Sequence, residues 1–119
     1  MDKKLQDSEI KIMNVIWREG EVTAKRVAEL LGAETGWNVN TTYTLIKRCI
    51  EKGAVERIEP NFTCRAIVSK EDVQRAEAET LIDKLFDGSA DKLFAALLGS
   101  ERLSAEELAR LRSMIDSME

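Results

Sequence analysis

Histidine is absent from this sequence, and cysteine, proline and aromatic residues are scarce. The 119 residues include no histidine and only two cysteines, Cys49 and Cys64. Without histidine, the Ser–His and Cys–His pairs that activate a catalytic nucleophile cannot form. Two cysteines alone also fall short of the four nitrogen or sulfur ligands that a structural zinc site requires. We therefore expect no metal and no other cofactor.

Other catalytic and membrane signatures are missing as well. The sequence has no glycine-rich phosphate-binding loop, and no apolar run approaches the roughly 20 residues of a membrane span. The first cations are not followed by a continuous apolar stretch, so no signal peptide is predicted. Neighbouring carboxylates such as Glu106 and Glu107 fall in the first turns of predicted helices, where they complement the helix dipole. The expectation is a cytoplasmic protein that is not an enzyme.

The two cysteines are predicted to be structural. Cys49 lies on the apolar face of a predicted helix, where a thiol behaves as a small hydrophobic group. A disulfide is not expected in a reducing cytoplasm. Redox sensing through Cys49 or Cys64 stays open as an alternative.

Charge is distributed unevenly along the chain. Residues 1–67 contain 11 basic and 10 acidic residues, whereas residues 68–119 contain 7 basic and 12 acidic residues, which gives net charges of +1 and −5. A nearly neutral first half can still present a basic face, because local clusters set the electric field at a surface. The acidic second half is not expected to contact DNA.

The most informative stretch is 38–53, NVNTTYTLIKRCIEKG. Asn38 is a good N-cap, and Gly53 favours a helix end. The apolar face of the helix is predicted to comprise Val39, Thr42, Leu45, Ile46, Cys49 and Ile50. The opposite face comprises Asn40, Thr41, Thr44, Lys47, Arg48 and Glu51. Such a helix can enter a DNA major groove, with its first turn at base edges and its cations at phosphates. The alternative is an ordinary solvated face.

The segments on either side of this helix favour the interpretation that it binds DNA. A helix capped by Asp7 or Ser8 is predicted to end at Gly20, after residues 1–6 that are expected to fray. A second helix is predicted to begin at Thr23 and to stop at Gly32. After Gly53, the segments 55–58 and 62–68 alternate like two strands of a hairpin. Three helices followed by a hairpin is the winged-helix order, with the hairpin as the wing. Arg57 and Arg65 on the wing are predicted either to contact phosphates or to be solvated strand-edge cations.

The remaining segment is predicted to form three amphipathic helices. Ser69 and Ser104 are the expected caps, and Glu107 completes a capping box with Ser104. Fifty residues of this kind form too small a core alone. They fold back on the wing domain or, as we favour, pack against a second chain. The predicted domains are thus a winged helix-turn-helix domain, 1–68, and a helical dimerisation region, 69–119, in a mainly α fold with a small β-hairpin. The predicted dimerisation residues are Leu81, Leu85, Phe86, Leu93, Phe94, Leu97, Leu108, Leu111 and Ile115.

Nearly the whole chain resembles the penicillinase repressor (BlaI/MecI-type) family of bacterial transcriptional regulators. The residues that carry the resemblance are Glu9, Met13, Ile16, Trp17, Trp37, Thr41, Thr44, Leu45, Arg48, Lys52 and Gly53. The resemblance implies a homodimeric repressor that binds a palindromic operator and controls genes of the β-lactamase type. It also implies a sensor-linked protease as a partner, which cuts the best-known members at an Asn–Phe bond. The aligned position here is Ala96–Leu97, and no cysteine follows Cys64, unlike in the copper-responsive relatives.

The main hypothesis is therefore a dimeric, sequence-specific DNA-binding repressor without membrane contact. Base contacts are predicted for Asn40, Thr41, Tyr43 and Thr44, and phosphate contacts for Lys47, Arg48, Arg57 and Arg65. The alternative function is a winged-helix protein-interaction module that has no DNA partner.

Overall fold

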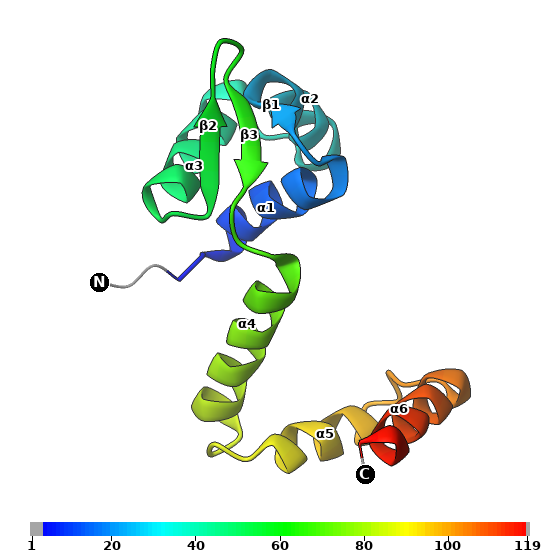
Figure 1. Cartoon of the computed structure of the whole chain (residues 1–119). Helices are drawn as coiled ribbons and strands as arrows, with labels where there is room; N and C mark the ends of the chain where they lie inside the picture. Colours follow the sequence, from blue (N-terminus) through cyan, green and yellow to red (C-terminus); the bar gives the residue numbers. More distant parts are fainter. Residues whose placement is uncertain (1–3, 119) are drawn as a thin grey trace. The chain divides into compact units, whose positions relative to one another are not determined.

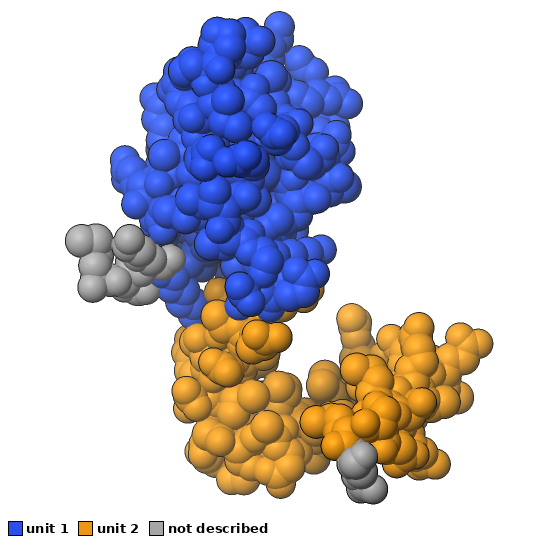
Figure 2. Space-filling view, viewed as in Figure 1, with its two compact units in different colours: residues 1–73 blue, residues 74–119 orange. Residues whose placement is uncertain are grey.

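A computed structural model of the chain describes residues 4–118. The chain forms two compact units, Met1–Val73 and Gln74–Glu119 (Figure 2). The elements in chain order are α1 (Asp7–Glu19), β1 (Val22–Thr23), α2 (Ala24–Thr35), α3 (Val39–Glu51), β2 (Val55–Ile58), β3 (Thr63–Ala66), α4 (Lys70–Leu85), α5 (Ala90–Gly99) and α6 (Ala105–Ser117) (Figure 1). Helix α4 begins in the first unit and continues into the second.

The first unit combines three helices with a three-stranded antiparallel sheet, and this arrangement confirms the predicted winged-helix order. The strand order is β1-β3-β2, with Val55 of β2 opposite Ala66 of β3 (Figure 1). On the other edge of β3, Val22 of β1 lies opposite Cys64. The sequence predicts only the β2–β3 hairpin, because a two-residue strand is too short to show an alternating pattern.

The start of α1 differs from the prediction. The N-cap is Gln6 rather than Asp7 or Ser8, and the Gln6 backbone N–H donates to Glu9 Oε1 at 2.7 Å. Leu5 is buried in the core with 7% of its surface exposed. The expected fraying of residues 1–6 is therefore wrong for residues 5 and 6, while residues 1–3 lie outside the described residues.

Helix α2 begins as predicted and ends later than predicted. Thr23 is the N-cap, and its hydroxyl oxygen accepts a hydrogen bond from the Arg26 backbone N–H at 3.1 Å. The helix runs past Gly32 and ends at Gly36, whose φ of 78° is left-handed. Gly36 is the better stop because glycine adopts this conformation without a Cβ clash.

Apolar side chains of the first three helices form the core of the first unit. The largest fully buried apolar side chains there include Ile12, Met13, Ile16, Leu31 and Ile46. Each burial of this size contributes roughly 1.5–3 kcal/mol to stability. Trp17, at the rim of this core, donates its indole N–H to the backbone oxygen of Val68 at 3.0 Å. This bond fastens the segment after β3 to α1.

The second unit exposes apolar side chains instead of burying them. Among the described residues of α4, α5 and α6, none is buried. Large apolar side chains with at least 36% exposure are Leu81, Leu85, Phe94, Leu97, Leu98, Leu108, Met114, Ile115 and Met118. The predicted capping box of α6 is confirmed, with Ser104 and Glu107 exchanging two hydrogen bonds of 2.9 and 3.1 Å. No helix within residues 4–118 has the length and apolar character that crossing a membrane requires.

Candidate nucleic-acid interface

Local capping fixes both ends of α3, as the sequence predicts. Asn38 Oδ1 accepts a hydrogen bond from the Thr41 backbone N–H at 2.8 Å. At the other end, Lys52 is the C-cap and Gly53 follows with a φ of 77°. The predicted helix is therefore present, with the predicted N-cap and with glycine just after its C-cap. Which of its side chains are available for binding depends on the face that the rest of the unit covers.

The first unit covers one face of α3 and leaves the opposite face in solvent. Thr42, Leu45, Ile46 and Cys49 are buried. The exposed residues include five of the predicted DNA contacts, Asn40, Thr41, Thr44, Lys47 and Arg48, whereas Tyr43 is half-buried. Val39 does not lie on the covered face as predicted, because 57% of its surface is exposed. It sits at the edge of the helical stripe, where periodicity alone does not decide burial.

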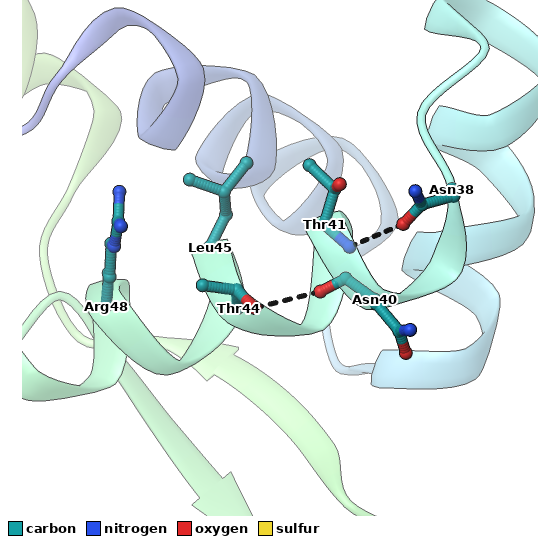
Figure 3. A pocket seen from close by; sticks show the side chains of 6 residues that line it. All are labelled: Asn38, Asn40, Thr41, Thr44, Leu45 and Arg48. Atoms are coloured by element: carbon teal, nitrogen blue, oxygen red, sulfur yellow. Dashed lines mark hydrogen bonds between the residues drawn. The ribbon is translucent and has the colours of Figure 1, made fainter.

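A shallow depression of about 320 Å³, named here the α3 depression, lies along this exposed face. It is lined by Asn38, Asn40, Thr41, Thr44, Leu45 and Arg48 (Figure 3). The Thr44 hydroxyl donates to the backbone oxygen of Asn40 at 2.9 Å, so its oxygen remains free to accept a hydrogen bond (Figure 3). The depression therefore combines a hydrogen-bond acceptor, an amide and a guanidinium on one helix face.

The wing contacts α3 through an aromatic pair that the sequence did not predict. The ring of Phe62, in the turn between β2 and β3, meets the ring of Tyr43 edge-on, with centroids 5.8 Å apart and planes at 75°. The Arg57 guanidinium lies 3.8 Å from the Phe62 ring centroid. Tyr43, which the sequence predicts as a base contact, thus packs against the wing. No sequence pattern indicated this pair, because its partners lie on different elements.

Both predicted wing cations are paired with acidic residues of the wing itself. Arg57 forms an ion pair with Glu59, and Arg65 Nη2 lies 2.7 Å from Glu56 Oε1. Glu56 and Arg65 are direct cross-strand partners in the β2–β3 register. All of these pairs are largely exposed, so each contributes little stability and can be exchanged for a phosphate.

A buried ion pair anchors the end of α3. Lys52 Nζ donates to Glu9 Oε1 at 2.6 Å and to the backbone oxygen of Lys4 at 2.7 Å. Glu9 is only 1% exposed. Burial acts to raise the pKa of Glu9, but the hydrogen bonds from Gln6 and Lys52 outweigh it and hold this pKa below its ordinary value. The pair therefore ties α3 to α1 in its charged form.

The cysteines offer no reactive thiol. Both Cys49 and Cys64 are free and fully buried. Burial raises the pKa of the Cys49 thiol to about 12 and that of the Cys64 thiol to about 11. The thiolate needed for oxidation is thus scarce at neutral pH, which argues against the redox alternative. Within residues 4–118, no cluster of three or more His, Cys, Asp or Glu side chains could hold a metal ion.

An exposed cation on α2, which the sequence did not single out, lies beside α3. Lys25 lies in the first turn of α2, two residues after the Thr23 cap, and is exposed. It lines a second depression, of about 260 Å³, beside the exposed face of α3. The sequence did contain a signal for a phosphate contact at Lys25. This residue follows the predicted start of a helix at Thr23, and the N-terminus of a helix attracts phosphate.

Comparison with known proteins gives consistent matches along the chain. The model of the family described as penicillinase repressor matches residues 5–117. The methicillin resistance regulatory protein MecI of Staphylococcus aureus is 27% identical over 121 residues, which cover 98% of both chains. The penicillinase repressor of Bacillus licheniformis is 22% identical over 115 residues, covering 95% of this chain and 90% of the relative. The solution structure of the DNA-binding domain of the repressor BlaI superposes with a TM-score of 0.55 at 25% identity. That match covers 59% of this chain and 88% of the BlaI domain.

Proposed function

Because the chain belongs to the penicillinase repressor family, we propose that it binds an inverted-repeat DNA operator as a homodimer and represses the adjoining genes. The observation that carries this proposal is the exposed face of α3, which presents amide, hydroxyl and cationic groups on a capped, well-anchored helix. The names of the relatives point to antibiotic-resistance genes as the regulated class. Such a repressor acts in the cytoplasm, where bacterial DNA lies.

The first turns of α3 supply the base contacts. The Asn40 amide both donates and accepts, which suits the N6 and N7 edge of adenine. The Thr44 hydroxyl already donates to the Asn40 backbone, so it acts as an acceptor toward the amino group of adenine or cytosine. Thr41 and Tyr43 border the same surface. These contacts read sequence because they face base edges rather than the DNA backbone.

Phosphate contacts surround the reading surface, a name used here for Asn40, Thr41, Tyr43 and Thr44. Lys47 and Arg48 lie one turn beyond Thr44 on α3, and Lys25 lies at the start of α2. On the wing, Arg57 and Arg65 reach phosphates by exchanging their acidic partners for the DNA backbone. These five cations would form a local basic face even though residues 1–67 are nearly neutral in net charge.

The second unit supplies the dimer contacts. A groove of about 460 Å³, named here the α5–α6 groove, is lined by Phe94, Leu98, Leu108, Leu111, Arg112 and Ile115. Of the nine predicted dimer residues, Phe86, Leu93 and Leu111 are half-buried and the other six are exposed. A second copy of the same helices would cover this apolar surface and place two α3 helices on two half-sites.

A sensor-linked protease would act on this second unit. Ala96 and Leu97 lie inside α5, and 38% of the surface of Leu97 is exposed. A cut between them would separate the first unit from α6, and the affinity gained by joining two half-site contacts would be lost. The expected product is a fragment that ends at Ala96, which mass spectrometry of extracts from induced cells would detect.

Selection from a random DNA pool tests the proposal. The full chain is incubated with the pool at moderate salt, and the retained duplexes are sequenced over several rounds. Enrichment of an inverted repeat is the expected result. Weak binding without enrichment, lost as salt rises, would overturn the proposal and favour a winged helix that binds proteins instead.

A further inference from the structure

The exposed residues of α3 include a large apolar side chain, Val39. Val39 is the first residue of α3 and is 57% exposed, whereas the polar residues around it account for the proposed hydrogen bonds. Val39 and Tyr43, one turn apart, line a depression together with Lys25, Ala28 and Glu29 of α2. We name this depression the Val39 recess.

The Val39 recess is apolar inside and charged at its rim. The valine methyls, the Tyr43 ring and the Ala28 methyl are its apolar components. The Tyr43 ring is held by its edge-on contact with Phe62, so this wall is fixed. At the rim, Glu29 is paired with Arg26 at 3.3 Å, which leaves the Lys25 cation to attract an anion.

We propose that the Val39 recess receives the C5-methyl group of an operator thymine and that Val39 is a specificity-determining residue. This inference rests on the proposed DNA-binding function. In the major groove, thymine is the base that presents a methyl group, and apolar side chains recognise it. Val39 lies in the first turn of α3 together with Asn40 and Thr41, which are proposed to contact bases. Lys25 at its rim is placed to contact a phosphate beside that thymine.

Replacement of thymine by uracil tests this inference, because uracil lacks only the methyl group. Symmetry-related thymines of the selected operator are replaced one pair at a time, and the dissociation constant of the full chain is measured. At one symmetry-related pair of thymines, the replacement is expected to weaken wild-type binding. The loss of one buried methyl group in each half-site corresponds to roughly fourfold per half-site, or about fifteenfold for the whole operator. In the Val39→Ala variant, the same replacement is expected to change affinity less than twofold.

A neighbouring variant serves as the control. Asn40→Ala is expected to weaken operator binding while it keeps the wild-type ratio of thymine to uracil affinity. Specific binding with an equal thymine-to-uracil ratio in wild type and Val39→Ala, at every position, would overturn this inference alone. A wild-type protein that binds no sequence specifically would overturn the proposed function and this inference with it. Because Val39 is exposed, its replacement by alanine is not expected to unfold the protein, and circular dichroism checks this.

Discussion

The Lys52 ammonium lies 2.6 Å from the buried Glu9 carboxylate and joins the C-terminal end of α3 to the first turn of α1. The two residues are 43 positions apart in the sequence. Because Lys52 also donates to the Lys4 backbone oxygen, two hydrogen bonds hold the end of α3. The charged pair therefore adds to the buried side chains Leu45, Ile46 and Cys49 in holding α3 against the rest of the first unit.

Replacing Glu9 by glutamine is expected to lower the free energy of unfolding of the first unit by about 1–3 kcal/mol, because a buried charged hydrogen bond is lost. Urea unfolding followed by tryptophan fluorescence measures this, since Trp17 and Trp37 both lie in the first unit. Glu29→Gln is the matched control, because its pair with Arg26 is exposed and is expected to change stability by less than about 1 kcal/mol. Equal effects of the two variants would contradict the anchoring role.

The stabilisation by Glu9 is expected to depend on pH. Its pKa in the folded protein is lowered from the ordinary value of 4.5, so the contribution is fully present above about pH 4.5. It is lost as the pH falls through the lower folded-state pKa, where the carboxyl group becomes protonated. The difference in unfolding free energy between wild type and Glu9→Gln, measured from pH 7 to pH 3, should therefore shrink toward the acidic end. A difference that stays constant or grows would contradict this assignment.

Lys47→Ala is expected to weaken binding to all DNA sequences and to reduce the slope of log K against log salt by about 1, because one phosphate contact is removed. Titrations at several salt concentrations give both quantities. Lys11→Ala is the control, since Lys11 is an exposed α1 cation that lies beside Asn14 and Glu34, away from the proposed interface. If the affinity and salt slope of Lys47→Ala match those of wild type, Lys47 does not contact phosphate.

Thr44→Ala is expected to change base preference more than overall affinity. The Thr44 oxygen is a free acceptor because its proton is donated to the Asn40 backbone, and alanine removes that acceptor without adding bulk. Selection with the variant should relax the preference at one position of each half-site, at a cost of about 1–3 kcal/mol in discrimination. An unchanged preference across a randomised operator would remove Thr44 from the reading surface.

Leu111→Asp is expected to halve the mass of the protein in solution, from about 27 kDa for two 13.4 kDa chains to a single chain. The substitution places an unpaired charge in the α5–α6 groove, which the second copy is proposed to cover. Sedimentation velocity measures the mass, and circular dichroism checks that the helices remain. Ala109→Asp, on the same helix but outside the lining of the α5–α6 groove, should stay dimeric. A dimeric Leu111→Asp protein would place the interface elsewhere.

Local signals in the sequence were sufficient to predict several elements. The Asn38 cap and Gly53 delimit α3, and Ser104 with Glu107 delimits the start of α6, because capping depends on residues three or four positions apart. The hairpin was predictable from another local pattern, the alternation of apolar and polar residues along 55–58 and 62–68. In contrast, β1 gains its structure only by pairing with β3, and two residues carry no periodic signal.

The parts of the site that were not predicted depend on contacts between distant segments. The Glu9–Lys52 pair and the Tyr43–Phe62 contact join different elements, so no spacing within one helix indicates them. The pairing of Arg65 with Glu56 requires the strand register. Val39 lies at the edge of the apolar stripe of α3, where burial depends on how far the neighbouring helix extends.

The ratio of the dissociation constants for specific and scrambled DNA is the decisive test of sequence-specific binding by the full chain. The dissociation constant is measured at physiological salt for the selected inverted repeat and for a duplex of the same composition with both half-sites scrambled. The inverted repeat is expected to bind at least about a thousandfold more tightly than the scrambled duplex. Equal affinities for the two duplexes would contradict sequence-specific recognition by the exposed face of α3.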